Sequence, residues 1–348
     1  MTEVAITERS HPDSILVTGG CGFIGSNFIR FLLSLENPPQ IINFDALTYA
    51  GNLENLADCL DHPKHIFVKG DIRDFTLVSQ TFKECAPDAV VNFAAESHVD
   101  RSIESPQDFF ETNVGGTLVL LRAALKYGIK RYLQISTDEV YGSLGATGNF
   151  TEETPLAPNS PYSASKASAD HFVRAYYHTY GLDTVTTRCS NNYGPYQFPE
   201  KLVPLMINNA RHNKRLPVYG DGLNIRDWIH VKDHCNGIWN ALTDGKAGEV
   251  YNFGGNWELT NIELVKKIIN IMGKSESLIN FIPDRPGHDF RYAIDSIKAR
   301  KELGWSPSTE FNSGLRDTVD WYLQNEDWVN SVTSGEYLAY YQRHYGNI

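Results

Sequence analysis

The sequence predicts a doubly wound α/β fold, in which helices cover both faces of a parallel sheet. Short runs rich in apolar and β-branched residues recur along the first half of the chain, and segments with helical spacing separate most of them. Nearly continuous apolar strands that alternate with helix-length segments indicate βαβ units and a sheet buried on both faces. The runs lie at residues 15–19, 41–45, 65–71, 89–95, 131–137 and 184–190.

Length and charge exclude some classes of function. With 348 residues and 41% hydrophobic composition, the chain can bury a large core and suggests one large or two closely joined domains. The formal net charge is -11, and the 31 Lys and Arg residues are scattered. A nucleic-acid partner is not expected, because binding to a phosphate backbone needs a basic patch.

Cysteine and histidine patterns indicate no metal. The five cysteines are odd in number, dispersed and without a CxxC pair, which predicts neither a disulfide framework nor a zinc site and favours a reducing cytoplasm. His230 and His234 have i, i+4 spacing, but no third ligand accompanies them. We therefore expect no metal ion.

No segment predicts a membrane partner. The N-terminal residues lack a basic stretch followed by an apolar core, and no later segment approaches 18 uncharged apolar residues. Residues 1–12 are expected to form a short disordered extension. Pro and Ser cluster at residues 153–163, where we expect a surface loop. These observations favour a cytoplasmic location.

The first strand leads into a glycine pattern. In TGGCGFIGSN the glycines Gly19, Gly22 and Gly25 are followed by Asp45, which ends the second strand. Such a pattern alone fits a tight turn equally well. A strand, a glycine turn, a helix N-terminus and a strand-end acid in this order, however, match the Rossmann-type dinucleotide fingerprint. Asp45 has no Arg directly after it, which favours NAD over NADP because a carboxylate repels a 2′-phosphate.

Two adjacent acids, Asp138 and Glu139, follow Thr137 at the end of the strand at 131–137. Adjacent acids at a strand end are most often solvated surface. In an open α/β sheet, however, ligands collect outside the carboxyl ends of the strands, so these acids would face the crevice. They are therefore candidate catalytic groups.

A tyrosine and a lysine share one face of the next predicted helix, at residues 163–181. Tyr162 and Lys166 have i, i+4 spacing at its start. A phenol, with a pKa near 10, acts as a base near neutrality only if nearby positive charge favours the phenolate. The Lys166 ammonium and an oxidised nicotinamide would supply that charge, so we predict that Tyr162 is the base of an oxidation.

These residues resemble the extended short-chain dehydrogenases/reductases that act on nucleotide sugars, with Thr137, Tyr162 and Lys166 matching their Ser/Thr and YxxxK residues. Within that superfamily the chain is most similar to the dTDP-glucose 4,6-dehydratases, from Ile15 to about Tyr345. The similarity rests on TDEVYG, AAESHVDRS, YSASKAS, SNNYGPYQFPEKL, RDW and DRPGHDFRY.

The resemblance implies an enzyme that uses NAD to convert dTDP-glucose to a 4-keto-6-deoxy sugar. After oxidation at C4, Glu139 would take the C5 proton and Asp138 would protonate the departing C6 hydroxyl. Hydride would then return to C6. A protonated Asp138 at neutral pH needs a raised pKa, which burial beside a second carboxylate provides.

The resemblance also implies two sets of contact residues. The expected cofactor set is Gly19, Gly22, Phe23, Ile24, Gly25, Asp45, Ala46, Leu47, Thr48, Asp71, Ile72, Phe93, Ala94, Ala95, Ser97, Thr112, Tyr162, Lys166 and Asn192. The expected substrate set is Ser97, Thr137, Asn191, Lys201, Leu202, Pro217, Val218, Tyr219, Arg226, Asn261, Asp284, Arg285, Pro286, Gly287 and His288. In the second set Arg226 and Arg285 would counter phosphate charge.

We expect two interleaved domains and a homodimer. Residues 13–190, with a return segment at about 226–256, would bind NAD, and residues 191–225 with 257–348 would bind the nucleotide sugar. The resemblance implies a dimer built from paired helices near 117–126 and 163–181. The stripe of Phe172, Tyr176 and Tyr180 would be a core or dimer face.

Two alternatives remain open at this point. A UDP-glucose 4,6-dehydratase would share every catalytic residue and differ only in the contact with the thymine methyl, worth about 1 kcal/mol. A non-enzymatic NAD-binding sensor would need the glycine fingerprint but would have no use for Tyr162, Lys166 or the two acids.

Overall fold

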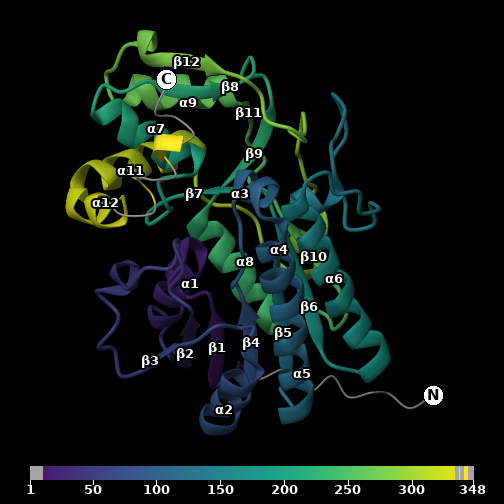
Figure 1. Cartoon of the computed structure of the whole chain (residues 1–348). Helices are drawn as coiled ribbons and strands as arrows, with labels where there is room; N and C mark the ends of the chain where they lie inside the picture. Colours follow the sequence, from purple (N-terminus) through teal and green to yellow (C-terminus); the bar gives the residue numbers. More distant parts are fainter. Residues whose placement is uncertain (1–10, 334–336, 338–340, 344–348) are drawn as a thin grey trace.

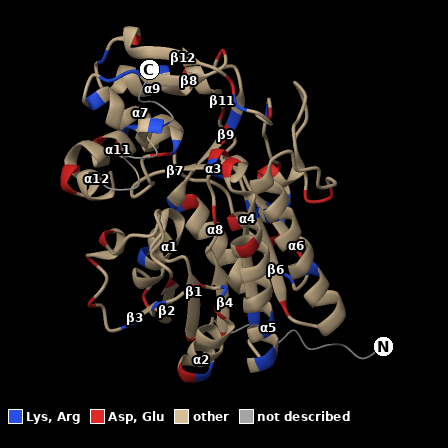
Figure 2. Ribbon diagram, viewed as in Figure 1, with Lys and Arg blue, Asp and Glu red and all other residues tan. Residues whose placement is uncertain are grey.

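The computed structural model describes residues 11–333, 337 and 341–343 (Figure 1). Apart from residues 11 and 12, the predicted N-terminal extension lies outside the described residues. The larger part is a sheet with helices on both faces, and a smaller group of strands and helices lies over one end of it. Figure 2 shows basic and acidic residues interspersed over both parts. No described helix has the length and apolar character that crossing a membrane requires.

The main sheet is parallel throughout. In the described residues it has seven strands in the order β10-β6-β5-β4-β1-β2-β3. The strands are β1 (Ser14–Thr18), β2 (Gln40–Asp45), β3 (His65–Lys69), β4 (Ala89–Asn92), β5 (Arg131–Thr137), β6 (Thr184–Cys189) and β10 (Val250–Phe253). This confirms the predicted doubly wound class. Several strands end earlier than predicted, because the chain turns away at Gly19, Gly70 and Phe93.

Helices cover the two faces of the sheet. One face packs against α1 (Phe23–Leu33), α8 (Val231–Asp244) and α10 (Ile297–Leu303). The other packs against α2 (Phe75–Cys85), α5 (Thr117–Tyr127) and α6 (Pro161–Tyr180). Each face has its own apolar core, because strands buried on both sides present side chains alternately to each.

Short segments connect these elements. Between β4 and α5 lie α3 (Val99–Glu104), α4 (Pro106–Phe109) and the π-helical segment η2 (Phe110–Gly116). The 3-10 turns are η1 (Leu53–Leu56), η3 (Asp138–Tyr141) and η4 (Glu276–Leu278). Because π-helical turns are common at functional sites, we expect η2 to contribute ligand contacts.

The smaller part has its own sheets and core. Its three-stranded sheet contains β7 (Asn191–Tyr193), β9 (Ile225–His230) and β11 (Glu258–Thr260), and its two-stranded sheet contains β8 (Leu216–Tyr219) and β12 (Ile279–Ile282). Its helices are α7 (Leu202–Arg211), α9 (Asn261–Ile271), α11 (Phe311–Gln324) and α12 (Glu326–Val332). Their apolar faces form a separate core cluster.

The chain passes between the two parts more than once. The strand β10, in the predicted return segment, pairs with β6 in the main sheet. The helix α10 comes from the stretch predicted to bind the sugar, yet it packs on α8 and β10. The predicted domain boundaries themselves stay a prediction.

Local sequence explains where α6 begins and ends. Ser160 and Ser163 form a reciprocal capping box, and Pro161 occupies the first turn. Gly181 ends the helix with φ 71°, a left-handed conformation that glycine adopts without a Cβ clash. The predicted surface loop therefore gives way to α6 at Pro161, which fixes Tyr162 in the first turn.

The tight packing of the core beneath α8 predicts that truncating a side chain there strongly lowers the free energy of unfolding. Trp305 is 1% exposed, its ring lies 4.7 Å from that of Phe253, and its Nε1 donates to the carbonyl of Asp233 over 2.9 Å. Trp305→Ala should lower the free energy of unfolding by about 3–5 kcal/mol, measured by urea titration. Phe281→Ala, at a side chain 56% exposed, should change it by about 0.5 kcal/mol or less. Equal losses in the two variants would contradict this core assignment.

Candidate active site

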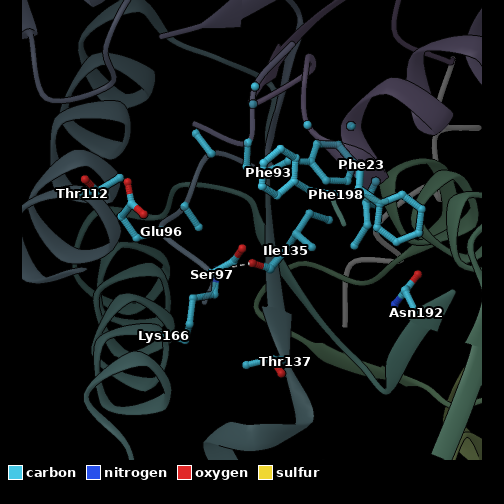
Figure 3. Close-up of a pocket in the computed structure, with 18 of the residues that line it drawn as sticks. Phe23, Phe93, Glu96, Ser97, Thr112, Ile135, Thr137, Lys166, Asn192 and Phe198 are labelled. Atoms are coloured by element: carbon cyan, nitrogen blue, oxygen red, sulfur yellow. Dashed lines mark hydrogen bonds between the residues drawn. The ribbon is translucent and has the colours of Figure 1, made fainter. Parts of the chain in front are cut away.

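A cavity of about 440 Å³ lies along the carboxyl ends of the parallel strands (Figure 3). Its lining includes residues that follow β1, β2, β4, β5 and β6. This edge is the crevice where open α/β sheets bind ligands, next to the point at which strand order reverses between β1 and β4. All the predicted cofactor residues except Leu47 line the cavity.

The turn after β1 can be made only by small residues. Gly19 has φ 67°, and a Cβ there would lie 2.6 Å from the backbone nitrogen of Ala94. A Cβ on Gly25 would lie 2.3 Å from the carbonyl oxygen of Gly19. Helix α1 then starts after Gly22 without a side-chain cap, so its N-terminus faces the cavity uncovered. This arrangement fits a pyrophosphate, because backbone N–H groups can approach it closely.

Asp45 is held as a fixed acceptor at the end of β2. Its Oδ2 accepts from the backbone N–H of Cys21, and its Oδ1 from that of Leu47, each over 2.8 Å. Burial raises the pKa of Asp45, while these two hydrogen bonds act in the opposite direction. Leu47 thus contributes through its backbone although its side chain lies outside the cavity lining. The glycine turn and this carboxyl group together fit a dinucleotide.

Asp71 is paired with a residue that sequence reasoning missed. Nε and Nη2 of Arg73 donate to Asp71 over 2.6 to 3.0 Å. Burial alone would raise the pKa of Asp71, but the bonds from Arg73 outweigh it, and the pKa lies below its ordinary value. Arg73 lines the cavity as well, and its position two residues after Asp71 could have indicated this.

The first of the two strand-end acids is buried. Asp138 is 2% exposed, and its Oδ1 accepts from Oγ1 of Thr137 over 3.3 Å. Its Oδ2 has no hydrogen-bond partner among the described residues. Burial, followed by the charges of Glu139 and Asp227, raises the pKa of Asp138 well above its ordinary value. Asp138 is therefore suited to carry a proton at neutral pH.

The second acid has a different electrostatic environment. Burial raises the pKa of Glu139 too, but the positive charges of Arg285, Arg226 and Lys201 act against the rise. Both acids line the same cavity. Two neighbouring carboxyl groups whose environments push their pKa values apart are suited to act as an acid and a base.

Lys166 is buried and points toward the end of β5. Its Nζ donates to the carbonyl of Ile135 over 2.6 Å, the dashed line in Figure 3. Burial lowers its pKa. Burial and the charge of Glu139 raise the pKa of Tyr162 well above its ordinary value, so the expected phenolate needs further positive charge in the cavity.

The predicted substrate residues fall into two groups. Ser97, Thr137, Asn191, Lys201 and Leu202 line the cavity, and Nζ of Lys201 donates to the carbonyl of Ser97 over 2.7 Å. The others lie outside its lining, in the smaller part: Pro217, Val218, Tyr219, Arg226, Asn261, Asp284, Arg285, Pro286, Gly287 and His288.

Two residues of the second group meet at Asp100, which sequence reasoning did not single out. Its two oxygens accept from Nη1 of Arg285 over 3.1 Å and from the hydroxyl of Tyr219 over 3.0 Å. Nε of Arg285 is buried and has no hydrogen-bond partner among the described residues. Arg226 donates instead to backbone carbonyls, including that of Asp289 over 2.9 Å.

Asn192 is oriented by a histidine. Nδ1 of His234 lies 2.9 Å from Oδ1 of Asn192. Burial lowers the pKa of His234 to about 3, so its ring is neutral and can donate to this oxygen. In the described part of the chain, no three His, Cys, Asp or Glu residues are grouped as metal ligands.

Other cavity residues were not predicted. They are Phe44, Ala50, Gly51, Gly70, Arg73, Glu96, Asp108, Ile135, Ser136, Cys189, Ser190, Gln197, Phe198, Glu200, Val203 and Trp228. Glu96 and Glu200 stand next to predicted residues in the sequence, and that adjacency was the available signal. Trp228 reaches the cavity from β9, and its signal was its place in the RDW stretch that supports the resemblance.

The tight backbone contact at the glycine turn predicts that a side chain added there weakens NAD binding. Gly19→Ala should weaken NAD binding roughly tenfold or more, because the added methyl would push against the chain at Ala94. Gly128→Ala is the matched control: its φ is 68°, but a Cβ there meets nothing within 4 Å. It should cost about 1–2 kcal/mol of stability and leave NAD binding unchanged. The measurements are the NAD released on denaturation and equilibrium titration; equal NAD binding in both variants would contradict the assignment.

Comparisons with known proteins agree with this geometry. A family model described as GDP-mannose 4,6 dehydratase matches residues 16–318. The dTDP-glucose 4,6-dehydratase of Xanthomonas campestris is 56% identical, over 92% of this chain and 96% of that protein. Among solved structures, the dTDP-glucose 4,6-dehydratase of Bacillus anthracis in complex with NAD is 55% identical to this chain in sequence. The match covers 91% of this chain and 99% of that one, with a TM-score of 0.86. The structure of the dTDP-glucose 4,6-dehydratase of Streptomyces venezuelae with NAD and TYD bound is 51% identical to this chain. That match also covers 91% of this chain and 99% of the other, with a TM-score of 0.89. This chain therefore belongs to the family of the dTDP-glucose 4,6-dehydratases.

Proposed function

We propose that this NAD-dependent enzyme converts dTDP-glucose to dTDP-4-keto-6-deoxyglucose and water, with the roles divided among five residues of the cavity. The observation that carries the proposal is the pair of unlike carboxyl groups, Asp138 and Glu139, in the same cavity as Tyr162 and Lys166. Of the two nucleotides that the sequence left open, the relatives favour dTDP.

The first step is oxidation at C4 of the hexose. When bound, NAD would supply the acceptor for the hydride that leaves C4 and the donor for its return to C6. Tyr162 takes the proton of the C4 hydroxyl, and Thr137 holds the same oxygen. Lys166, fixed to the carbonyl of Ile135, supplies positive charge that stabilises the phenolate as it forms.

Water then leaves across C5 and C6. The C4 ketone acidifies the C5 proton, which Glu139 removes; the electron pair forms the C5–C6 double bond as the C6–O bond breaks. Asp138 donates its proton to the leaving oxygen, which departs as water. The opposing charges of Arg285, Arg226 and Lys201 favour ionised Glu139, whereas burial keeps Asp138 protonated. Hydride return to C6 and a proton to C5 complete the product.

A homodimer in the cytoplasm is part of the proposal. Apolar side chains on and beside α5 and α6 are exposed, including Phe110 at 58% and Tyr180 at 56%, with Leu125 and Phe172. The two helices pack side by side, so these side chains offer one face to a second copy. Tyr176, in contrast, is buried. The five cysteines are free, which supports a reducing compartment.

The two acids predict separable defects. Asp138→Asn should still oxidise C4, seen as absorbance at 340 nm in a single turnover, but stall before water leaves, with turnover lowered by roughly 100-fold or more. Because Asp138 must be protonated, the dehydration rate of the parent should fall as pH rises through the raised pKa of that group. Glu139→Gln should in addition slow exchange of the C5 hydrogen with deuterated solvent.

The control for these variants is Glu258→Gln, which removes a carboxylate that pairs with Arg291 outside the cavity lining. It should leave both steps at the parental rate. If Asp138→Asn and Glu139→Gln also dehydrate at the parental rate, or if neither reduces NAD, the assignment of acid and base is wrong.

Tyr162 predicts a defect at the earlier step. Tyr162→Phe retains the ring, which lies edge-on 6.2 Å from that of Phe109, but removes the base for the C4 hydroxyl. Single-turnover reduction of NAD should fall by roughly 100-fold or more while dTDP-glucose still binds. Normal reduction of NAD by this variant would refute the proposed role.

A further inference from the structure

A buried network connects α6 to the segment that carries the two acids. Asp170 lies one turn of α6 beyond Lys166, and its Oδ2 accepts from Nε of Arg188 over 2.9 Å. Nη1 of Arg188 donates to the hydroxyl of Tyr141 over 3.0 Å, and Tyr141 donates to Oδ1 of Asn252 over 2.8 Å. All five side chains are buried. Tyr141 is the last residue of η3, two positions after Glu139.

The ion pair leaves one carboxylate oxygen unused. Oδ1 of Asp170 is buried and has no hydrogen-bond partner among the described residues, while Arg188 occupies Oδ2. Lys166, at i−4 on the same helix, has three N–H donors, and the only hydrogen bond of its Nζ recorded in the described structure goes to Ile135. A buried carboxylate oxygen therefore stands one helical turn from a buried ammonium.

We propose that Asp170 is a positioning residue for the reaction: its carboxylate, held in place by Arg188, keeps Lys166 charged and directed at the cavity. The inference rests on the proposed role of Lys166 beside Tyr162.

The charges around Lys166 support this assignment. Burial lowers the pKa of Lys166, and Asp170 is the strongest of the groups that raise it, followed by Cys189 on β6. The elements packed on α6 are α3, α4, α5, β5, β6, η2 and η3. Their other titratable and charged residues are Asp100, Arg101, Glu104, Asp108, Glu111, Arg122, Lys126, Tyr127, Arg131, Tyr132, Asp138, Glu139, Tyr141 and Arg188.

The first measurement is the pH profile of C4 oxidation. Asp170→Asn removes the negative charge, so Lys166 should lose its proton at lower pH. In single turnovers with dTDP-glucose, the rate of NAD reduction should fall at high pH, and we call this fall the alkaline limb of the profile. In Asp170→Asn the alkaline limb should lie at a pH lower by about one unit or more. Asp170→Glu, which keeps the charge, should restore the limb toward its parental position.

The matched control is Asp183→Asn. Asp183 pairs with buried Arg131 over 2.9 to 3.1 Å at the opposite end of β6, so its loss also breaks a partly buried ion pair. This variant should be destabilised without any shift of the alkaline limb. A shift in both variants would mean that loss of stability, rather than loss of charge beside Lys166, causes it.

The second measurement, the pH dependence of stability, needs no activity. Lys166 has a lower pKa in the folded chain than in the unfolded chain. At a pH below the folded pKa, burial of its charge therefore lowers the free energy of unfolding. This cost disappears as the pH rises toward the unfolded pKa, near 10.4. Asp170→Asn lowers the folded pKa further. Its loss of stability relative to the parent should therefore be largest at pH 7 and shrink toward pH 10. The loss in Asp183→Asn should stay constant over that range.

Each outcome decides between a positioning role and a structural one. If Asp170→Asn matches Asp183→Asn in both measurements, Asp170 only stabilises the fold and the inference is wrong. Should Asp170→Asn fail to fold, the double variant Asp170→Asn with Arg188→Gln leaves no buried guanidinium without its carboxylate and should show the same direction of both shifts. If the parent enzyme forms no 4-keto sugar from dTDP-glucose, the proposed function fails, while the stability measurement still decides the role of Asp170.

Discussion

Burial of ionisable groups at the carboxyl end of β5 is the constraint on which the rest of the structure depends. Asp138 and Lys166 are both buried there, and a buried charge is costly unless it is neutralised or paired. The protein meets this cost in two ways. Asp138 gains a raised pKa, which favours its neutral form. Lys166 stays close to a strand carbonyl and to Asp170, which offset the loss of its hydration.

The parallel sheet is what brings these groups to the cofactor. Because every neighbouring pair of strands is parallel, the ends of β1, β2, β4, β5 and β6 meet at one edge. The glycine turn after β1 touches the backbone that follows β4, and the acids follow β5, the next strand along. A hydride acceptor bound at the turn and a proton donor at the end of β5 can therefore reach one hexose.

The smaller part makes the two acids unlike. Asp138 and Glu139 are neighbours in the sequence and share the cavity, yet the charges that oppose a pKa rise at Glu139 come from Arg285, Arg226 and Lys201, all in the second half of the chain. Burial is the largest effect on the pKa of both acids; at Asp138 the charges of Glu139 and then of Asp227 on β9 add to it, and Arg226 opposes it. The different electrostatic environments of the two acids thus arise in part from the packing of the smaller part over the sheet edge.

The sequence by itself determined the sheet, the glycine turn and the residues proposed for catalysis. Those features depend on short-range order: apolar runs of strand length, glycines at fixed spacing, and Tyr162 one helical turn from Lys166. Only the tertiary structure decided that Arg188 holds Asp170, that Asp100 engages Arg285, and that β10 completes the sheet beside β6. These partners are separated in the chain, and neither their contact nor their burial exists until the chain folds.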